Sequence, residues 1–369
     1  MNGLIALLLA FAALGAADKL LGGRLGVAEE FDRGLAAMGG LCCSMSGIYC
    51  AAVTVLPGMA QALGALGLPF DPSLPAGMLL AVDMGGWAAA DALAAGPALA
   101  VYSGLLVAST LGCLVSFSLP VALGSLPGRE VPGYMQGVLW GVIALPAGLA
   151  AGGLAAGLSP GALAANLWPV AALCAVLAAC LRLCPRVCVG ALHVLGEAVR
   201  WLGILLFCAM VLGVFWPGAA FVPPEVVSEA LVIVLRITAV VCGSQVAGRI
   251  AMARGGRWIA AAARRLGTNE YGVLGLMVSA VSSVSMLPLY GRMDVRGKVL
   301  NAAFTVAGSF VLGGQLAFVT SVAGGRAVAA YFVCKLLAGA LAAALAVKFT
   351  SNNPRPAPGV RRETGGKTT

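Results

Sequence analysis

The chain has 369 residues, 60% of them hydrophobic and only 10% charged, and its mean hydropathy is +0.98. These values exclude an ordinary soluble domain and a disordered chain, and they are typical of a protein that lies in a lipid bilayer. The net charge of +9 does not indicate a nucleic-acid partner, because the basic residues lie between apolar segments, as in the cytoplasmic loops of membrane proteins.

Eleven apolar segments follow one another along the chain, and most have the length of a membrane-spanning helix. The first resembles a secretory signal, but Lys19 follows its apolar run instead of preceding it, so we expect a retained helix. The sequence therefore predicts an all-α polytopic membrane protein. The segments lie near residues 3–17, 35–57, 74–96, 98–122, 134–158, 161–181, 201–217, 227–246, 271–290, 300–323 and 328–347.

The third segment is interrupted at its centre. Between Asp71 and Pro97, two apolar arms flank the tetrapeptide that begins at Asp83, Asp-Met-Gly-Gly. Each arm of about ten residues reaches roughly 15 Å as a helix, about half of a ~30 Å hydrocarbon core. A broken segment of this kind is tolerated in a membrane where its backbone lines a protein-enclosed cavity, so we expect a re-entrant helical hairpin over 71–97. The alternative is a surface loop in which Asp83 only caps the second arm.

A weak internal repeat relates the two halves of the chain. The stretch from Gly67 aligns with the stretch from Gly267, which lays the Asp83 tip over Ser282 and Ser283 and predicts a second hairpin over 268–291. The predicted organisation is a first membrane repeat, a connecting helix with a basic cytoplasmic segment, a second membrane repeat, and a disordered basic tail: residues 1–158, 159–197, 198–348 and 349–369.

The positions of the basic residues predict the topology. If all eleven segments cross the membrane and the N-terminus is outside, 11 Lys and Arg residues lie inside and 10 outside. If the two hairpins return to their own side, 20 lie inside and only Arg326 lies outside. The positive-inside rule favours the second arrangement. It has about nine transmembrane helices plus two re-entrant hairpins, an inverted repeat of two five-segment halves, an outside N-terminus and a cytoplasmic C-terminus. One hairpin enters from each side, so we expect the two tips to meet near the midplane and to hold a substrate between them.

Four stretches carry a family resemblance: FDRGLAAMGGLCCSMSGI from Phe31, VDMGGWAAADALAAG from Val82, YSGLLVASTLGCLVSFSLPVALG from Tyr102, and MDVRGKVLNAAF from Met293. In this order they resemble the ethanolamine permease family of ethanolamine-utilisation operons (EutH). The resemblance covers nearly the whole chain. It implies uptake of ethanolamine, a small amine, across the bacterial inner membrane.

The second repeat departs from the family pattern. Ser282-Ser283 stands where the family has Asn-Asn, and Gly313-Gly314-Gln315 stands where it has Gly-Asp-His. Arg236 replaces a small residue within a helix, whereas Lys335 matches a Gly-Lys element of the family. An acid and an imidazole are therefore missing and a cation is added. A different, zwitterionic small amine is accordingly the alternative substrate.

Ethanolamine is a cation at neutral pH with a hydroxyl group, so its site needs a counter-ion, an aromatic face and polar partners. Asp83 is the predicted counter-ion, because intramembrane carboxylates are costly and usually functional. Trp87 follows one turn later, either against the ligand or as a core aromatic residue. The predicted substrate-binding residues are Asp83, Met84, Gly85, Gly86, Trp87, Ser282, Ser283, Ser285 and Gln315, with Arg236 and Lys335 as possible charge partners.

Other functional classes fit the sequence less well. Cys180, Cys184 and Cys188 share a helical face, but His193 is the only histidine, so we expect neither a metal site nor a cofactor. No Ser-centred Gly motif lies near that histidine, which argues against an enzyme. A passive facilitator or channel shares the same fold signals as a secondary transporter and stays open as the alternative. A homo-oligomer is compatible with the sequence.

Overall fold

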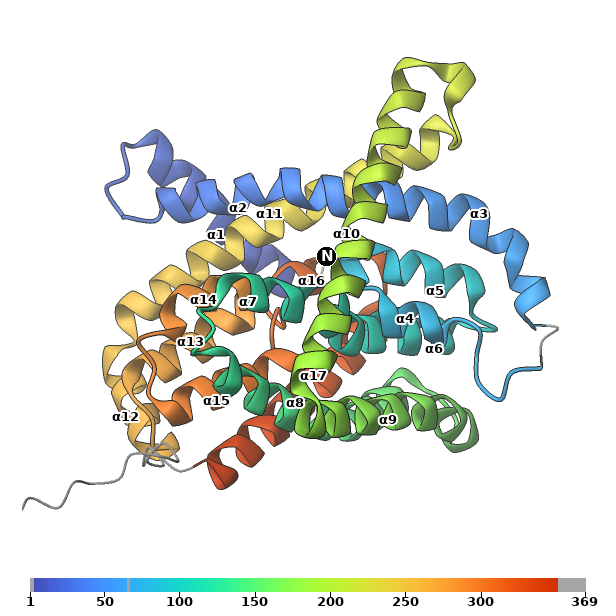
Figure 1. Cartoon of the computed structure of the whole chain (residues 1–369). Coiled ribbons are helices and arrows are strands. Elements are labelled where there is room, and N and C mark those ends of the chain that lie inside the picture. The colour runs from blue at the N-terminus through green and yellow to red at the C-terminus, as the bar shows by residue number, and fades with distance from the viewer. Residues whose placement is uncertain (1–2, 65–66, 351–369) are drawn as a thin grey trace, which may run out of the picture.

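The computed structural model describes the backbone of residues 3–64 and 67–350, and this part of the chain is helical and has no strand (Figure 1). Residues 351–369, nearly all of the predicted tail, lie outside the described residues. The elements in chain order are α1 (Gly3–Leu20), α2 (Ala28–Leu41), η1 (Cys42–Ser46), α3 (Gly47–Gly64), α4 (Leu74–Leu79), η2 (Val82–Gly86), α5 (Trp87–Leu93), α6 (Pro97–Ala100), η3 (Val101–Gly112), η4 (Leu114–Ser118), α7 (Leu119–Ser125), α8 (Val131–Ala156), α9 (Pro160–Leu183), α10 (Pro185–Phe215), η5 (Pro217–Ala219), α11 (Pro224–Arg254), α12 (Gly256–Leu266), α13 (Glu270–Val281), α14 (Ser283–Tyr290), α15 (Val295–Ala307), α16 (Gly314–Val322) and α17 (Gly325–Phe349).

Several of these helices have the length and composition of membrane spans, so the protein is a multi-pass membrane protein. The predicted segment 201–217 is the second half of the longer helix α10, which crosses the other helices in Figure 1. The predicted boundary between residues 197 and 198 therefore lies inside one helix. Within residues 3–64 and 67–350, the seven candidate spans are Ala28–Leu56, Pro97–Ser125, Val131–Ala156, Pro160–Leu183, Gly190–Phe215, Pro224–Ala251 and Gly325–Phe349.

The first predicted hairpin is a pair of short helices that folds back on itself. The chain leaves α4 in an extended conformation at Leu80 and Ala81, and it enters α5 through the turn η2. At the base of the hairpin, the backbone N–H of Ala95 donates a 3.0 Å hydrogen bond to Oδ2 of Asp71. The ends of the segment therefore meet, and its interrupted centre lies at the far end.

The second predicted hairpin has the same outline. Helices α13 and α14 are separated by the single extended residue Ser282, and they pack against each other. Nδ2 of Asn269 donates a 2.9 Å hydrogen bond to the carbonyl of Arg292 and so joins the two ends. Each hairpin's return to its own side of a membrane stays a prediction.

A third interruption was not predicted. The segment 300–323 was expected to be one helix, but it is divided into α15 and α16 by residues 308–313. Phe310 has a positive φ of 59°, and its N–H donates to the carbonyl of Ser279 at 3.0 Å. The N–H of Leu312 donates to the carbonyl of Ala280 at 2.8 Å. This loop therefore satisfies carbonyl groups at the C-terminal end of α13, which explains why the chain leaves the helix here.

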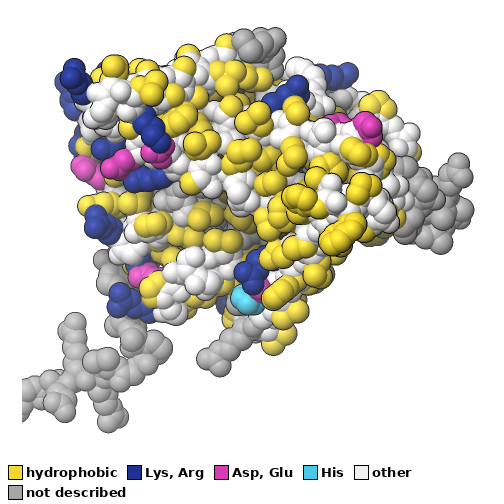
Figure 2. Space-filling model, turned by 90° about the horizontal axis from the view of Figure 1, so that it is seen from above, with side chains coloured by type: hydrophobic (Ala, Val, Ile, Leu, Met, Phe, Trp, Pro, Cys, Tyr) yellow, Lys and Arg dark blue, Asp and Glu magenta, His cyan; other side chains and the backbone are white. Residues whose placement is uncertain are grey.

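Two loops that are distant in sequence lie at one end of the molecule. Nζ of Lys298, in α15, is 2.6 Å from Oε2 of Glu130, in the loop before α8. If every predicted segment crossed the membrane, these loops would lie on opposite sides. Figure 2 shows that many Lys and Arg side chains on the visible face gather toward the left of the view.

The centre of the bundle is formed by α8, α15, α17 and η3. A Cβ atom added at Gly148 of α8 would lie 2.5 Å from Cβ of Ala338 in α17, and one added at Gly152 would lie 2.6 Å from Cβ of Cys334. Small residues permit this close approach of two helix backbones. The contact brings the middle of α17, including Lys335, into the protein interior.

Candidate functional site

The tip of the first hairpin is an unwound stretch held tightly by its neighbours. Gly85 adopts φ 87°, which an L side chain rarely adopts, and a Cβ atom there would overlap Ile48 of α3. At Gly86 a Cβ atom would lie 2.7 Å from the carbonyl oxygens of Leu80 and Ala81. Met84 is buried beside Cys113. The two glycines therefore let the chain turn tightly and place the partly buried Asp83 at the tip.

A cationic side chain lies in the interior near this tip. Lys335 is fully buried, and its Nζ donates hydrogen bonds to the carbonyl of Ser109 at 2.8 Å and to Oε1 of Gln315 at 2.7 Å. The Nζ atom also lies 5.3 Å from the ring centroid of Tyr331. A carbonyl oxygen, an amide oxygen and an aromatic face thus surround a primary ammonium group.

Asp83, Gln315 and Lys335 form one electrostatic cluster, which we call the inner cluster. The charges of Asp83 and Lys335 interact, and the thiol of Cys113 lies close enough to interact with all three residues. Among the described residues, however, no ion pair joins Asp83 directly to Lys335. The carboxylate therefore lies in the field of a cation without a direct ion pair to it in the part of the chain that the structure describes.

The start of α16 supplies the second element of the inner cluster. Gln315 is the second residue of that helix, directly after the unpredicted loop 308–313, and α16 packs against η2. The second arm of the second hairpin, α14, packs mainly on α13 and α7, but the tip of this hairpin lies beside the loop 308–313, because a Cβ atom added at Gly313 would overlap the carbonyl oxygen of Val281. The tip residue Ser282 caps α14 by accepting a 3.4 Å hydrogen bond from the N–H of Ser285. The structure therefore brings Gln315 to the first tip. Ser282, Ser283 and Ser285 lie at the turn of the second hairpin, next to the loop that precedes Gln315, and their role in substrate binding stays a prediction.

Arg236 lies on the exposed face of α11, beside the exposed residues Val232 and Leu235. No ion pair involves it in the described part of the chain. Of the two predicted charge partners, only Lys335 lies at the inner cluster.

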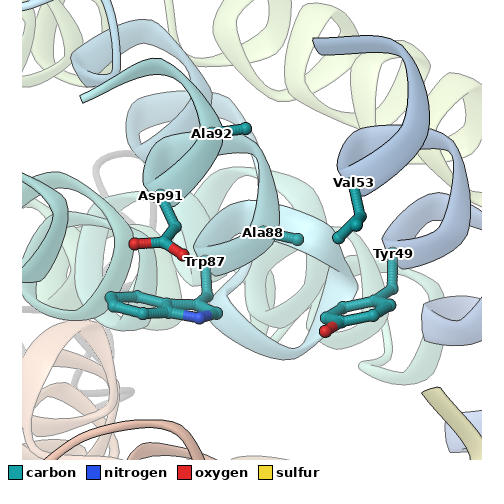
Figure 3. A pocket seen from close by; sticks show the side chains of 6 residues that line it. All are labelled: Tyr49, Val53, Trp87, Ala88, Asp91 and Ala92. Atoms are coloured by element: carbon teal, nitrogen blue, oxygen red, sulfur yellow. The ribbon is translucent and has the colours of Figure 1, made fainter. Parts of the chain in front are cut away.

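Trp87 faces a separate pocket instead of the inner cluster (Figure 3). This pocket lies between α3 and α5 and has a volume of about 190 Å³. We call it the outer pocket; it is lined by Tyr49, Val53, Trp87, Ala88, Asp91 and Ala92.

Sequence reasoning missed Cys113, the carbonyl of Ser109 and Tyr49. Cys113 and Tyr49 occupy apolar helices without a motif, and a carbonyl oxygen has no side-chain signature. Gly308 and the pair Gly313-Gly314 were the available signal for the loop that positions Gln315, because glycine clusters often mark a break in a helix.

Comparison with known proteins agrees with the resemblance. The family described as "Ethanolamine utilisation protein, EutH" matches residues 1–349. The chain belongs to the EutH family. It is 31% identical over 353 residues, covering 93% of this chain and 92% of the relative, to the probable ethanolamine permease EutH of Listeria monocytogenes serotype 1/2a (strain 10403S).

Two further relatives extend the comparison. The chain is 33% identical over 368 residues, 95% of each protein, to the uncharacterized protein YxeR of Bacillus subtilis (strain 168). It is 28% identical over 328 residues, 79% of this chain and 78% of the relative, to the probable ethanolamine permease EutH of Escherichia coli (strain K12). No solved structure matches. The part matched to the EutH family includes both hairpins and Lys335.

Proposed function

We propose that this protein is a transporter that takes up ethanolamine, or a closely similar small amine, across the bacterial inner membrane. The substrate ammonium binds at the inner cluster, against the carboxylate of Asp83. Membership of the EutH family and the apolar helices support this function, since relatives are named as probable ethanolamine permeases.

The observation that carries the proposal is the coordination of Lys335. Its side chain ends in a primary ammonium, the same group that ethanolamine carries, and two oxygen atoms accept hydrogen bonds from it inside the bundle. The interior thus already accommodates an ammonium close to Asp83. A substrate ammonium that reaches the same carboxylate gains a counter-ion in a region from which water is largely excluded.

The proposed topology follows the positive-inside arrangement. The N-terminus is outside, the C-terminus is cytoplasmic, and the two halves form an inverted repeat with two re-entrant hairpins. The hydrogen bonds that join the ends of each hairpin and the ion pair between Glu130 and Lys298 support it. In a cysteine-free background, Gly128→Cys should resist an impermeant external thiol reagent in intact cells and react after the membrane is opened. Labelling from outside would contradict this topology.

Two alternatives to this function are transport of a zwitterionic amine and passive facilitation of the same substrate. A zwitterionic substrate needs a cation aimed at its acidic group, and the exposed position of Arg236 argues against that role for this residue. A passive facilitator differs from a secondary transporter only in energy coupling.

Flux into proteoliposomes tests the function and separates these mechanisms. We expect labelled ethanolamine to accumulate above its external concentration only when a proton or sodium gradient is imposed. Equilibration without any gradient would identify a facilitator. If uptake does not exceed that of protein-free liposomes, the proposed function is wrong.

A further inference from the structure

The outer pocket has the shape of a small-ligand site. Its walls come from two elements, with Tyr49 and Val53 on α3 and Trp87 and Asp91 on α5. In Figure 3 the side chain of Val53 points toward Ala88, and the carboxylate of Asp91 lies beside the ring of Trp87. A cavity of about 15 Å³, measured in the same way, can hold one water molecule. At about 190 Å³ the outer pocket can therefore hold a ligand of several non-hydrogen atoms.

The charge of the outer pocket is negative and unneutralised. Asp91 is exposed, and within the described part of the chain no ion pair or side-chain hydrogen bond involves its carboxylate. A second carboxylate, that of Glu229 on α11, lies close enough to interact with Tyr49. No Lys or Arg residue lines the pocket. A cation bound here would meet the carboxylate of Asp91, with a second acidic group behind Tyr49 and no Lys or Arg in the lining.

The aromatic residues complete a cation site. Trp87 lies one helical turn before Asp91, and Tyr49 lies on the opposite helix. The faces of Trp and Tyr rings attract ammonium groups, and small apolar residues such as Val53 and Ala88 fit a short carbon chain. An anion is repelled by this lining, and a neutral polar molecule can donate a hydrogen bond to the carboxylate but lacks the attraction between opposite charges.

The position of Asp91 in its helix argues against a purely structural role. It is the third residue from the C-terminal end of α5, which ends at Leu93. A carboxylate is unfavourable at this end of a helix, because the helix dipole places partial negative charge there. Asp91 therefore neither caps α5 nor neutralises a basic neighbour, and a bound cation would compensate its charge.

We propose that the outer pocket is a second binding site for small organic ammonium compounds, which receives the substrate cation before it reaches the inner cluster. Asp91 is the counter-ion, and Trp87 and Tyr49 supply the aromatic faces. The place of this site on the transport path rests on the proposed function, but its binding of ammonium does not. The two sites differ in charge: Asp83 shares its field with Lys335, whereas Asp91 has no cationic partner among the described residues.

Equilibrium binding separates the two sites. In purified Asp83→Asn protein the inner counter-ion is absent, so remaining binding of ethanolamine or tetramethylammonium reports the outer pocket. We expect such binding, and we expect Asp83→Asn/Asp91→Asn to weaken it by about tenfold or more. Trp87→Leu should weaken it as well, and Trp87→Phe should weaken it less. If Asp83→Asn protein binds neither compound, or if the added Asp91→Asn leaves binding unchanged, the outer site does not exist.

Uptake kinetics test the place of the site on the path. For Asp91→Asn alone we expect the KM for ethanolamine to rise about tenfold with little change in maximal rate, because saturating substrate bypasses a weakened first site. Glu225→Gln is the matched control, since it removes an exposed carboxylate of α11 that does not line the pocket. An unchanged KM in Asp91→Asn, beside normal wild-type uptake, would overturn the role in transport and leave the proposed function intact. If wild-type protein transports no ethanolamine but Asp83→Asn protein binds it through Asp91, the proposed function fails and the site stands.

Discussion

The two helical hairpins share a base and differ at the tip. In both, a side chain joins the ends by a hydrogen bond, from Ala95 to Asp71 in the first and from Asn269 to Arg292 in the second. The first tip contains a carboxylate and a positive-φ glycine, whereas the second is a single extended serine that caps the next helix. The similar outlines therefore end in different chemistry: the first tip carries a charged side chain, and the second carries serine hydroxyl groups.

Of the substitutions that test the difference between the two tips, we expect Asp83→Asn to have the largest effect on uptake. Asp83→Asn keeps the shape of the tip and removes the counter-ion. At an effective dielectric of about 20, a lost charge pair at 4 Å costs ~4 kcal/mol, roughly a thousandfold in affinity. We expect uptake of ethanolamine to be abolished while the amount of protein in the membrane is unchanged. Loss of the protein from the membrane would instead indicate that Asp83 is a capping residue.

Lys335 tests whether the inner cluster acts as a unit. Lys335→Met removes the positive charge near Asp83 and leaves the carbonyl of Ser109 and Oε1 of Gln315 without their donor, which costs about 1–3 kcal/mol of stability for each buried group left unsatisfied. Thermal unfolding in detergent should show a clear loss of stability, part of which returns in Lys335→Met/Asp83→Asn. Lys348→Met, on the exposed end of the same helix, is the control and should be nearly neutral. Equal losses in the single and double variants would mean that the two charges are not coupled.

Gly85 tests the shape of the first tip. Gly85→Ala forces an alanine to φ 87° and pushes its Cβ atom against Ile48, so we expect a loss of about 1–3 kcal/mol of unfolding free energy. In the same segment, Gly96 has an extended backbone and open space around its Cα, so Gly96→Ala should be tolerated. Comparable destabilisation by both variants would refute the requirement for glycine at the tip.

The smallest effect is expected at the second tip. Ser282→Ala removes the cap of α14 and should cost about 0.5–1 kcal/mol, since the capping hydrogen bond is long. Uptake of ethanolamine should be retained. Ser285→Ala leaves the cap in place and serves as the control. A severe loss of uptake in Ser282→Ala at normal protein levels would place the second tip in the substrate site.

The sequence predicted the position of a helix break best where a charged residue and glycines occur together within an apolar segment. Asp83 between apolar arms, next to two glycines, predicted a break between Asp71 and Pro97, and the described helices stop and restart there. It was less informative about α15 and α16. The loop between them lies within a continuous apolar run, and its backbone hydrogen bonds go to another segment. Those bonds, from Phe310 and Leu312 to the end of α13, are tertiary contacts with no local signature.

The internal alignment had a similar limit. It paired the Asp83 tip with Ser282 and Ser283, since equivalent positions of a repeat align in sequence. The inner cluster instead uses Gln315 at the start of α16 and Lys335 on α17, which reach Asp83 through the packing of the bundle. Which segments meet at the centre depends on the contacts between helices, and one sequence does not contain that information.

The most direct test compares ethanolamine binding at the two tips in purified protein. Calorimetric titration of wild-type, Asp83→Asn and Ser282→Ala/Ser283→Ala proteins measures what each tip contributes. We expect Asp83→Asn to weaken binding at the inner cluster by roughly a thousandfold and to leave only the binding of the outer pocket, while the double serine variant stays within about threefold of wild type. Wild-type affinity in Asp83→Asn, together with a large loss in the serine variant, would contradict the proposed role of Asp83.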